Sequence, residues 1–340
     1  MKALKRFPRV SIIILNHNGL CHLKECLESV TGVEYPDDKL EVILVDNGSQ
    51  DESVNFVREN FSTVKLVALN KNLGFAEGNN IGERYASGEY VVFLNNDTRV
   101  DKRWLAELIR TIDEDETVGV CGSKILFYRS PDTVNYAGGK ITPVGSGYEI
   151  NFGRKDALER GPKHVGYASG ASMIIRRGLF RKLEGFDKAY FIYCEDVDLS
   201  WRAWLQGYRV VYVPTSIIHH KFAGTSTPDI AYLWHRNAAM NIIKNFGSLN
   251  LIKGICLIFM FSIVKILEAL RSGRTPIAKS VACANMWAVR NLSALIHKRL
   301  RIQATRKLSD EALNAFGVFA NFKESLAEFR RNRSLLKTGY

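Results

Sequence analysis

The first hundred residues alternate short apolar runs with helical segments, and this alternation limits the fold more than any other feature of the chain. Four apolar runs are expected to be strands: Val10–Leu15, Val42–Val45, Val64–Leu69 and Tyr90–Leu94. Helices are expected between them, near 20–30, 51–60 and 77–86. Near-continuous apolar strands separated by helices are typical of a mostly parallel sheet that is covered on both faces. The pattern therefore predicts an α/β fold.

Composition places the chain among folded proteins of a reducing compartment. Apolar residues make up 46% and charged residues 24% of the 340 residues, which is ordinary for a globular protein. The six cysteines form no C-x-x-C pair and no regular spacing, which favours reduced thiols over a disulfide framework. The N-terminal apolar run is short and no small-residue cleavage site follows it, so it is interpreted as a strand and not as a signal peptide. A cytoplasmic location is expected.

Polar clusters follow three of the expected strands. They are Asn16-His17-Asn18-Gly19, Asp46-Asn47-Gly48-Ser49 and Asn95-Asn96-Asp97-Thr98. Ligands of open parallel sheets bind beyond the carboxyl ends of the strands, so these clusters are the candidate site. Neither a G-x-G-x-x-G after the first strand nor a G-x-x-x-x-G-K-S/T is present, which argues against dinucleotide and P-loop sites. Asp97 instead offers a carboxylate that could hold a divalent cation against a diphosphate.

Five strings in order carry a family resemblance: VSIIILNHNG, EVILVDNGSQDES, NLGFAEGNNIG, GEYVVFLNNDT and FIYCEDVDLSWRAW. Together they resemble a family 2 glycosyltransferase of the rhamnosyltransferase-like subgroup, over roughly Val10 to Asn245. The resemblance implies a GT-A fold, a nucleotide-sugar donor and inversion at the anomeric carbon.

The resemblance also implies where the donor binds. Asp46 corresponds to the aspartate that contacts the base, and Leu73–Phe75 to the segment that closes on the nucleotide. The nucleotide-sugar site is expected to contain Asn16, Asn18, Asp46, Gly74, Phe75, Asn79, Asn95 and Asn96.

A metal site is expected at Asn95-Asn96-Asp97, which stands where the family has its D-x-D motif. Because Asn95 replaces the first acid, Asp97 is the one anionic ligand of this motif. The competing role for Asp97 is to cap the helix that follows. A histidine of the family completes the metal shell or touches the diphosphate, and counting back from Ser226 favours His220 while leaving His219 open. Mg²⁺ or Mn²⁺ is the expected cofactor.

The catalytic base is expected in the pair Glu195-Asp196. Inverting transfer needs one carboxylate within hydrogen-bond reach of the attacking hydroxyl. The resemblance favours Asp196, with Glu195 orienting it or binding acceptor, and Asp198 is expected to cap the helix that follows.

Further residues are assigned to the acceptor and to phosphate. Ser172, Trp201 and Trp204 are placed on the acceptor side, although a core role is equally open for the two tryptophans. The irregular segment 128–163 is expected to select the acceptor. Phosphate contacts are considered for three residues: Lys221, Arg236 and Asn237.

The net positive charge is confined to the end of the chain. Residues 241–340 carry 17 Lys and Arg against 5 Asp and Glu, whereas the first 240 carry 30 of each. Leu251–Leu270 is too charged at its edges for a confident membrane span but suits a helix lying in the plane of a membrane surface. The alternative is a helix packed on the catalytic domain. The expected division is a GT-A domain at 1–245, with a nucleotide-sugar half to about 125 and an acceptor half to 245, and a basic, helical, membrane-surface-associating extension at 246–340.

The expected function is an inverting glycosyltransferase for cell-surface polysaccharide assembly. The donor is a nucleotide-diphosphate sugar, with dTDP-rhamnose first and hexose or furanose donors as alternatives, and the acceptor is a saccharide or a lipid-linked saccharide. A sugar nucleotidyltransferase and a non-catalytic membrane-surface adaptor are the alternative interpretations. Nucleic acid is not an expected partner, because no recognition motif accompanies the basic tail.

Overall fold

The computed structural model describes residues 6–159, 161–222 and 227–327 of the chain. Its strands are β1 Val10–Asn16, β2 Leu40–Asp46, β3 Lys65–Ala68, β4 Tyr90–Asn95, β5 Thr98–Val100, β6 Val118–Phe127, β7 Ser130–Tyr136, β8 Gly139–Ile141, β9 Gly147–Glu149, β10 Lys163–His164, β11 Ser172–Arg176 and β12 Arg209–His220. Its helices are α1 Leu20–Thr31, α2 Ser53–Asn60, α3 Gly74–Arg84, α4 Trp104–Glu114, α5 Arg177–Lys182, α6 Glu195–Leu205, α7 Pro228–Asn245, α8 Ser248–Arg271, α9 Thr275–Arg290, α10 Leu292–Ala304 and α11 Asp310–Ala315, with short 3₁₀ turns at Asp37–Lys39 and Lys188–Tyr190.

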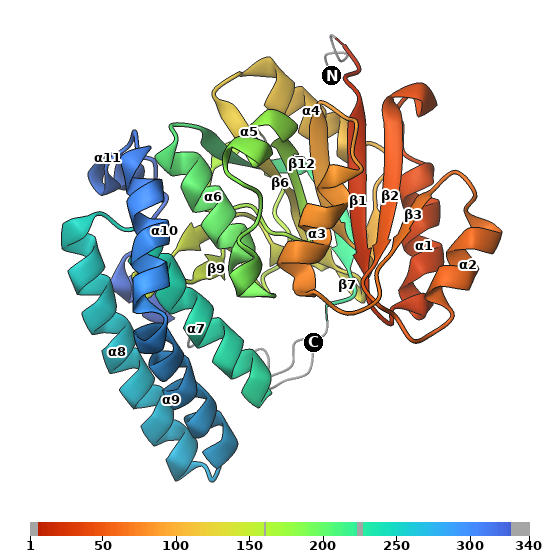
Figure 1. Ribbon diagram of the computed structural model, residues 1–340. Coiled ribbons are helices and arrows are strands. Elements are labelled where there is room, and N and C mark those ends of the chain that lie inside the picture. The colour runs from red at the N-terminus through yellow and green to blue at the C-terminus, as the bar shows by residue number, and fades with distance from the viewer. Residues whose placement is uncertain (1–5, 160, 223–226, 328–340) are drawn as a thin grey trace.

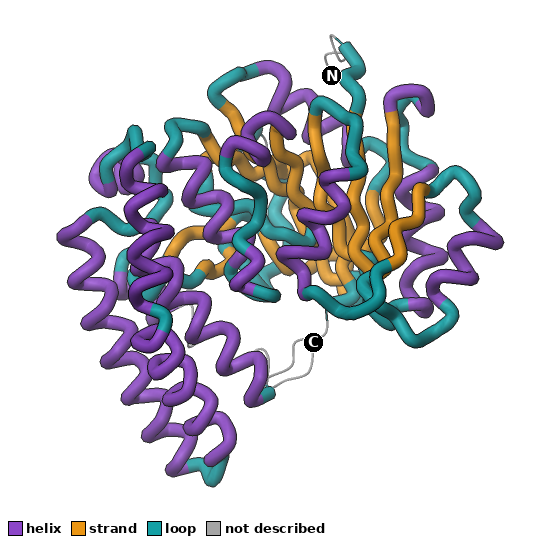
Figure 2. Tube along the Cα trace, in the orientation of Figure 1, coloured by secondary structure: helices purple, strands orange, loops and turns teal. Residues whose placement is uncertain are grey.

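A single large twisted sheet organises the fold (Figures 1 and 2). Its strands run in the order β10-β12-β6-β11-β4-β1-β2-β3, with β5 paired to β12 and β7 to β6. The strands β4, β1, β2 and β3 pair in parallel, whereas β11 is antiparallel to both β4 and β6. Helices α3 and α6 lie on one face of the sheet and α1 and α4 on the other (Figure 1). The predicted α/β fold with a mostly parallel sheet, covered by helices on both faces, is confirmed.

The parallel register determines where the site forms. Asn16 at the end of β1 lies beside Asp46 at the end of β2, and Leu15 lies beside Asn95 at the end of β4. The polar clusters that follow these strands therefore meet at one edge of the sheet. The runs Val42–Val45 and Tyr90–Leu94 are fully buried, and Val10–Leu15 is buried except at Leu15, as their lack of alternation predicts for strands covered on both faces. The edge strand β3 is partly exposed.

The C-terminal part of the chain is helical, as expected. Thr227 caps α7 by accepting a hydrogen bond from the backbone N–H of Ile230 at 3.2 Å. Helix α7 packs on α6 and also on α8, α9 and α10, so it joins the sheet domain to the helices that follow (Figure 1). By length and composition alone, α8 is long and apolar enough to cross a membrane. The predicted domain boundary at 245 stays a prediction.

The segment after α11 returns to the sheet domain. Backbone hydrogen bonds join Ile141 to Val318 and Ala320 at 2.9 Å each. The rings of Phe316 and Phe319 pack on α6. The returning segment is thus one of the attachments of the C-terminal extension to the sheet domain.

Candidate active site

A buried amide network closes the ends of the parallel strands. The Asn16 amide donates to Asp46 Oδ2 at 3.1 Å, and the Asn96 amide donates to Asn16 Oδ1 at 2.6 Å. Both Asn16 and Asp46 are almost fully buried. A side chain at Gly19 would overlap the amides of Asn16 and Asn96, so the chain turns here where only glycine fits.

The loop after β1 is tied to the loop after β2. Asn18 has a positive φ of 51°, which asparagine tolerates better than most residues. Its backbone N–H donates to Ser49 Oγ at 2.9 Å, and its side-chain oxygen accepts from the N–H of Gln50 at 2.7 Å. Two of the predicted donor-site loops are therefore one structural unit.

The segment before α3 is fastened to the same edge by Asn47. The Asn47 amide donates to Asn72 Oδ1 at 3.0 Å and to the carbonyl of Gly74 at 3.2 Å, and its oxygen accepts from the N–H of Leu73 at 2.9 Å. Gly74 has a φ of 81°, and a side chain there would overlap Phe191. Glycine is thus required where this segment meets the loop before α6.

Exposure divides the predicted nucleotide-sugar residues into two groups. Asn18, Phe75, Asn95 and Asn96 are partly or fully exposed, so their side chains can reach a ligand. The other four form the wall behind them: Asn16, Asp46, Gly74 and Asn79. The part of these four residues in donor binding stays a prediction. Asn79, for example, donates to the carbonyl of Phe75 at 2.9 Å within the first turns of α3.

Asp97 and His220 form the candidate metal pair. His220 Nε2 lies 3.1 Å from Asp97 Oδ1, and His220 Nδ1 lies 3.2 Å from Asn135 Oδ1. Burial opposes ionisation of Asp97, but the hydrogen bond and charge of His220, with a smaller effect of His22, outweigh it and lower the pKa of Asp97 below its usual value. A carboxylate oxygen and an imidazole nitrogen are both ligands of Mn²⁺, and the oxygen also suits Mg²⁺.

His219 faces another partner, because successive side chains of a strand point to opposite faces. Its Nδ1 lies 3.7 Å from Asp101 Oδ1. Burial, and to a lesser degree Arg99, lower the pKa of His219. The geometry thus favours His220 over His219 beside Asp97, while Ser226, from which the sequence was counted back, lies outside the described residues.

The donor set of this pair is small. In the ranges 6–159, 161–222 and 227–327, no three His, Cys, Asp or Glu side chains come together as a metal cage. Two protein ligands nevertheless fit a cation that takes the rest of its shell from a diphosphate and water, as Mg²⁺ sites for phosphates commonly do.

Glu195 and Asp196 open α6 after a left-handed residue, Cys194, with φ 65°. The two Asp196 oxygens accept from the backbone N–H groups of Gly170 at 2.9 Å and Val197 at 2.8 Å. Burial nevertheless raises the pKa of Asp196 above its usual value, and these hydrogen bonds act against that shift. The side chain remains partly exposed, so it can meet an acceptor hydroxyl.

Glu195 is more deeply buried than Asp196. Its Oε2 atom has no hydrogen-bond partner among the residues that the structure describes. Burial first, and then the charge of Asp196, raise the pKa of Glu195 well above its usual value. An unpartnered buried carboxyl is costly, which is a mark of a functional site.

One backbone link joins the base to the metal motif. Asp196 accepts from Gly170, and the next residue, Ala171, accepts from the N–H of Asn95 at 3.1 Å. A side chain at Gly170 would also touch the ring of Phe75. The candidate base, the start of the Asn95–Asp97 motif and the donor segment therefore meet at the same edge of the sheet.

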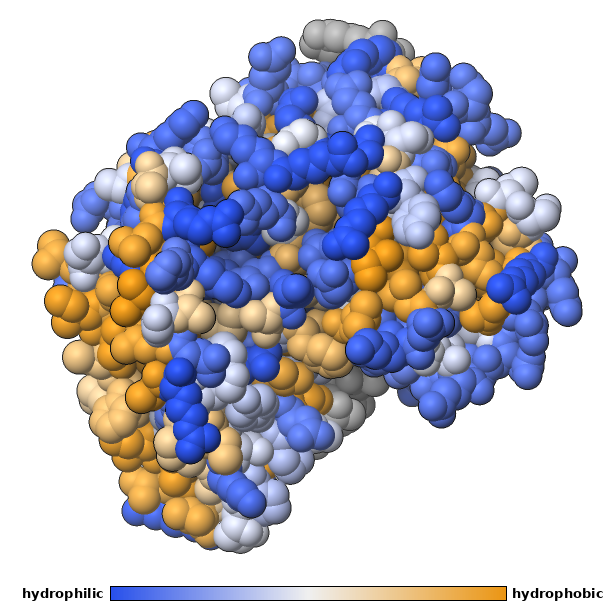
Figure 3. Space-filling model, in the orientation of Figure 1, coloured by the Kyte–Doolittle hydropathy of each residue, from blue (hydrophilic) through white to orange (hydrophobic). Residues whose placement is uncertain are grey.

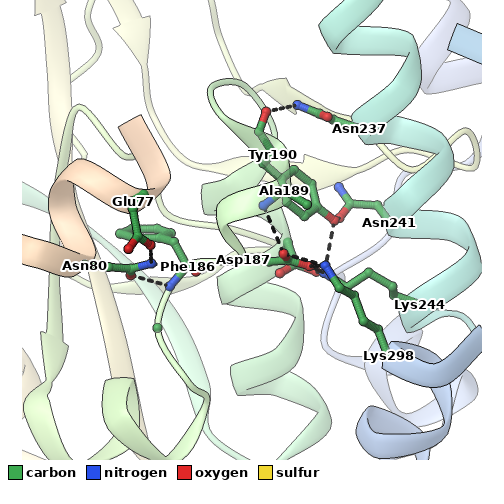
Figure 4. A network of polar contacts seen from close by, with 12 residues as sticks. Glu77, Asn80, Phe186, Asp187, Ala189, Tyr190, Asn237, Asn241, Lys244 and Lys298 are labelled. Carbon is green, nitrogen blue, oxygen red and sulfur yellow. Dashed lines mark hydrogen bonds and ion pairs between the residues drawn. The ribbon is translucent and has the colours of Figure 1, made fainter. Parts of the chain in front are cut away.

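The loop between α5 and α6 is held by the C-terminal helices (Figure 4). Asp187 pairs with Lys244 of α7 at 2.9 Å and with Lys298 of α10 at 2.7 Å. The amide of Asn237 on α7 lies 2.7–3.0 Å from the carbonyls of Tyr190, Ile192 and Tyr193. These contacts define the loop brace, which consists of Asp187, Asn237, Lys244 and Lys298.

The brace corrects the expected phosphate contacts. Arg236 donates to the carbonyls of Ala189 and Tyr190 at 2.8 and 2.7 Å, and Asn237 is fully buried, so both support the loop. Lys221 pairs with Glu25 at 2.7 Å. Arg236 and Asn237 are therefore not directed at a strand-end phosphate position. Lys221 does lie at the strand end, where its backbone N–H donates to the carbonyl of Asp97 at 2.9 Å, and its phosphate contact stays a prediction.

Two aromatic residues of this loop were not singled out from the sequence. Phe191 and Tyr193 are 38% and 36% exposed, directly before the Glu195-Asp196 pair. Both have positive φ, 65° and 74°, a strained conformation for non-glycine residues that the brace stabilises. Their position suits stacking on a sugar ring. The sequence signal that could have pointed to these two residues is the string FIY at 191–193, shortly before Glu195-Asp196.

The expected acceptor-side residues are buried, which corrects their assignment. Trp201 packs edge-on against Phe246 and Phe319, and Trp204 stacks on Phe316. Ser172 lies in the core within hydrogen-bond distance of Trp104 and Ser123. These side chains do not reach an acceptor. Asp198, expected as a helix cap, is also in the core, where it pairs with Arg202 at 2.7 Å and Lys244 at 2.8 Å.

A cavity of about 970 Å³ lies beside the loop brace and not at the candidate catalytic residues. It is lined by α3, the loop after α5, and α10, including Asn80, Lys188 and Lys298, whereas Asp97 and Asp196 are not in its wall. Most of its charges are already paired with one another. One of these pairs, Asp187 with Lys298, belongs to the loop brace.

The chain also matches a known protein family. The sequence profile described as "Glycosyl transferase family 2" matches residues 11–184, and the chain belongs to this family. It is a glycosyltransferase with the GT-A architecture, a mixed α/β sheet followed here by C-terminal helices. Family 2 relatives of this chain include rhamnosyltransferases.

Two relatives and one solved structure illustrate the similarity. The chain is 28% identical to N-acetylglucosaminyl-diphospho-decaprenol L-rhamnosyltransferase of Mycobacterium tuberculosis, over 65% of this chain and 79% of that protein. It is 26% identical to rhamnosyltransferase WbbL of Escherichia coli, over 66% and 89%. The crystal structure of GalNAc-T7 with UDP, GalNAc and Mn²⁺ superposes with a TM-score of 0.60 at 18% identity, over 86% of this chain and 58% of that one, which supports the fold.

Proposed function

We propose that this protein transfers a sugar from a nucleotide-diphosphate donor to a hydroxyl of a saccharide or lipid-linked saccharide, with a divalent cation and with inversion. The observation that carries the proposal is the link through Gly170 and Ala171, which sets the Asp196 carboxylate at the edge where Asp97 and His220 lie.

Asp97 and His220 would hold the cation. When bound, Mg²⁺ or Mn²⁺ supplies positive charge that offsets the charge of the donor diphosphate and of the leaving group. Asn96 and Asn95, which are partly exposed beside Asp97, are available to orient the sugar phosphate. The similar GalNAc-T7 was crystallised with UDP and Mn²⁺, which supports this cofactor class.

Asp196 is the proposed base. It accepts the proton of the acceptor hydroxyl while the hydroxyl oxygen bonds to the anomeric carbon and the bond from that carbon to the diphosphate oxygen breaks, with its electrons leaving on the diphosphate. A raised pKa suits this role because it brings the carboxyl closer to the working pH. One displacement from the opposite face inverts the anomeric centre, and it requires no second carboxylate as nucleophile.

Glu195 supports Asp196 or contacts the acceptor. Its buried, unpartnered Oε2 favours an arrangement that an acceptor hydroxyl completes on binding. Tyr193 and Phe191 are the proposed stacking surfaces for a sugar, in place of Trp201 and Trp204.

The relatives suggest the substrates to test first. One is named for transfer of L-rhamnose to a diphospho-decaprenol-linked N-acetylglucosamine. We therefore propose dTDP-rhamnose as the first donor and a polyprenyl-diphosphate-linked saccharide as the first acceptor, acting at the cytoplasmic membrane face. Hexose and furanose donors are the alternatives on the same framework.

A donor screen tests the proposal. Purified protein is incubated with a panel of nucleotide sugars, with Mg²⁺, with Mn²⁺ or with a chelator, and release of the nucleoside diphosphate is measured. Release from one donor that requires metal and is lost in Asp196→Asn supports the transferase. Formation of pyrophosphate would favour a nucleotidyltransferase, and no turnover of any donor would favour an adaptor. The anomeric configuration of the product, measured by NMR, must differ from that of the donor.

A further inference from the structure

Helix α8 exposes an apolar face that the rest of the protein leaves uncovered. Its outward side chains are Ile255, Phe259, Met260, Ile263, Val264 and Leu267, which define the α8 face. Cys256 lies among them and is also exposed. Between Ile255 and Leu270, the exposed positions of α8 carry no charge. Figure 3 shows hydrophobic surface gathered along this outer edge of the molecule. A continuous exposed apolar surface marks an interaction site.

The inner side of α8 is packed, so the two sides of the helix differ in kind. Gly254 lies against Ile242 of α7 so closely that a side chain would displace it. Ser262 Oγ is 3.3 Å from the side-chain oxygen of Asn285 on α9. The buried residues of α8 are Gly254, Ile258, Ser262 and Ala269, so the packed side is mostly small, while most of the large apolar residues point outward.

Positive charges border the α8 face. Lys253 is exposed near the start of the helix, and Arg271 and Arg274 are exposed at its end. Lys279 is exposed on the adjoining turns of α9. This is the part of the chain that carries the whole net charge of +12. An apolar stripe bordered by lysine and arginine complements anionic headgroups above acyl chains.

We propose that α8 lies in the plane of an anionic lipid surface, with the α8 face in the acyl boundary and its bordering lysine and arginines among the headgroups. The face from Ile255 to Leu267 extends about 18 Å along the helix at 1.5 Å per residue. A membrane-spanning α8 would place Lys265 and Glu268 in the hydrocarbon and would separate α8 from α7 and α9. A helix lying in the plane of the surface keeps these two charges out of the hydrocarbon and keeps its packing on α7 and α9. This proposal rests on the proposed function in one respect, that the protein acts at the cytoplasmic face of the membrane. It adds that the α8 face is the surface of the protein that contacts the lipid.

Vesicle flotation of the full chain tests the surface. Phe259→Glu/Ile263→Glu is compared with the natural protein on vesicles of phosphatidylcholine and phosphatidylglycerol, and on phosphatidylcholine alone. The double variant is expected to lower the partition coefficient by about tenfold or more, and the natural protein is expected to prefer the anionic vesicles. Tyr85→Glu, at an exposed aromatic residue that ends α3 in the sheet domain, is the control and keeps full binding. Equal partitioning of the double variant and the natural protein would overturn the proposal.

Sedimentation velocity tests a second copy of the chain as the occupant. A dimer of the natural protein that the double variant dissociates, with vesicle binding unchanged, would assign the α8 face to self-association and contradict the lipid surface. Identical sedimentation coefficients for the natural protein and the double variant would support the lipid surface.

A depth measurement distinguishes lying in the surface from spanning. A fluorophore is attached to Cys256, or to Leu267→Cys in a Cys256→Ser background, with Cys21 and Cys283 replaced by serine. Both labels are expected to be quenched by bromine at the same shallow acyl depth, because an in-plane helix holds them level. A span would separate them by roughly 16 Å along the membrane normal. A label on exposed Cys21 of α1 is the control and is not quenched.

Donor hydrolysis separates this proposal from the proposed function. Phe259→Glu/Ile263→Glu is expected to keep metal-dependent hydrolysis in solution, because both side chains are exposed on the outer side of α8, which packs on α7 and α9. Loss of vesicle binding without any donor turnover would leave the lipid surface supported and the transferase contradicted. Metal-dependent turnover, together with vesicle binding that the substitutions do not change, would support the transferase and contradict the lipid surface.

Discussion

The Nε2 atom of His220 lies 3.1 Å from the Oδ1 atom of Asp97, which joins the end of β12 to the turn after β4. The motif around Asp97 has asparagine at its first position, so an imidazole nitrogen from another strand can supply the second ligand. The pair thus offers a cation two protein ligands that are already side by side.

Replacement of His220 tests its place in this pair. His220→Gln is expected to weaken Mn²⁺-dependent binding of a nucleoside diphosphate roughly 10-fold to 100-fold, as loss of a ligand-supporting group does. His219→Gln, on the other face of the strand and beside Asp101, is expected to change binding less than about twofold. Isothermal titration with and without Mn²⁺ measures both, and equal losses would assign the ligand role to neither or to both.

Replacement of Asp196 tests the base. Asp196→Asn is expected to lower kcat by roughly 10²- to 10⁴-fold, the usual loss for a general base. In the natural protein the raised pKa of Asp196 predicts that kcat falls on acidification at a higher pH than an ordinary aspartate would give. Stopped assays across pH measure both effects. If Glu195→Gln loses turnover and Asp196→Asn does not, the role belongs to Glu195.

Replacement of Glu195 tests the energetic cost of its burial. Because its pKa is raised in the folded state, ionisation at neutral pH destabilises the fold, and this penalty disappears as pH falls below the ordinary value of 4.5. Glu195→Gln is therefore expected to stabilise the protein by about 1 kcal/mol at pH 8, with the difference from the natural protein shrinking toward pH 4.5. Thermal unfolding across pH measures it. A variant less stable than the natural protein at pH 8 contradicts this account of the carboxyl.

Lys298 tests whether the loop brace positions the catalytic loop. Burial opposes ionisation of Asp187, but Lys244 and Lys298 outweigh it and lower the pKa of Asp187. The Asp187 carboxylate therefore stabilises the fold at pH values above the ordinary aspartate pKa of 3.8, and this contribution is lost as the pH falls through the lowered pKa. Lys298→Gln removes one partner and is expected to cost about 1 kcal/mol, since Lys298 is part-exposed and screened.

The catalytic effect of Lys298→Gln distinguishes positioning from simple stability. The kcat is expected to fall several-fold while donor affinity stays within about twofold, because the brace acts on the loop before Asp196 and not on Asp97. Lys298→Arg, which keeps the ion pair with Asp187, is expected to recover most of the turnover. Equal kcat for Lys298→Gln and the natural protein would limit the brace to a stabilising role.

Local patterns predicted most of the sheet domain. Strands β1 and β4 begin where the apolar runs begin, because covered parallel strands need no alternation. The helix expected near 77–86 in fact begins at Gly74, since the backbone there is set by Asn47 and Asn72 from outside the helix. The Asn47 contact joins residues that are far apart in the chain, so it leaves no periodic signal in the sequence.

The acceptor side could not be predicted from local patterns. Trp201 and Trp204 are covered by Phe246, Phe316 and Phe319, of which two come from a segment more than a hundred residues later. Helical spacing alone cannot show that coverage. Asn237 likewise resembles any polar residue of a helix until the fold places it against the loop carbonyls of Tyr190 and Ile192.

Nucleoside diphosphate binding by Asp97→Asn and Asp196→Asn, measured by titration calorimetry with and without Mn²⁺, tests the division of labour most directly. We predict that Asp97→Asn loses the Mn²⁺-dependent part of the affinity, at least about tenfold, whereas Asp196→Asn binds as tightly as the natural protein but does not transfer sugar. Metal-dependent binding that survives in Asp97→Asn and disappears in Asp196→Asn would contradict the account.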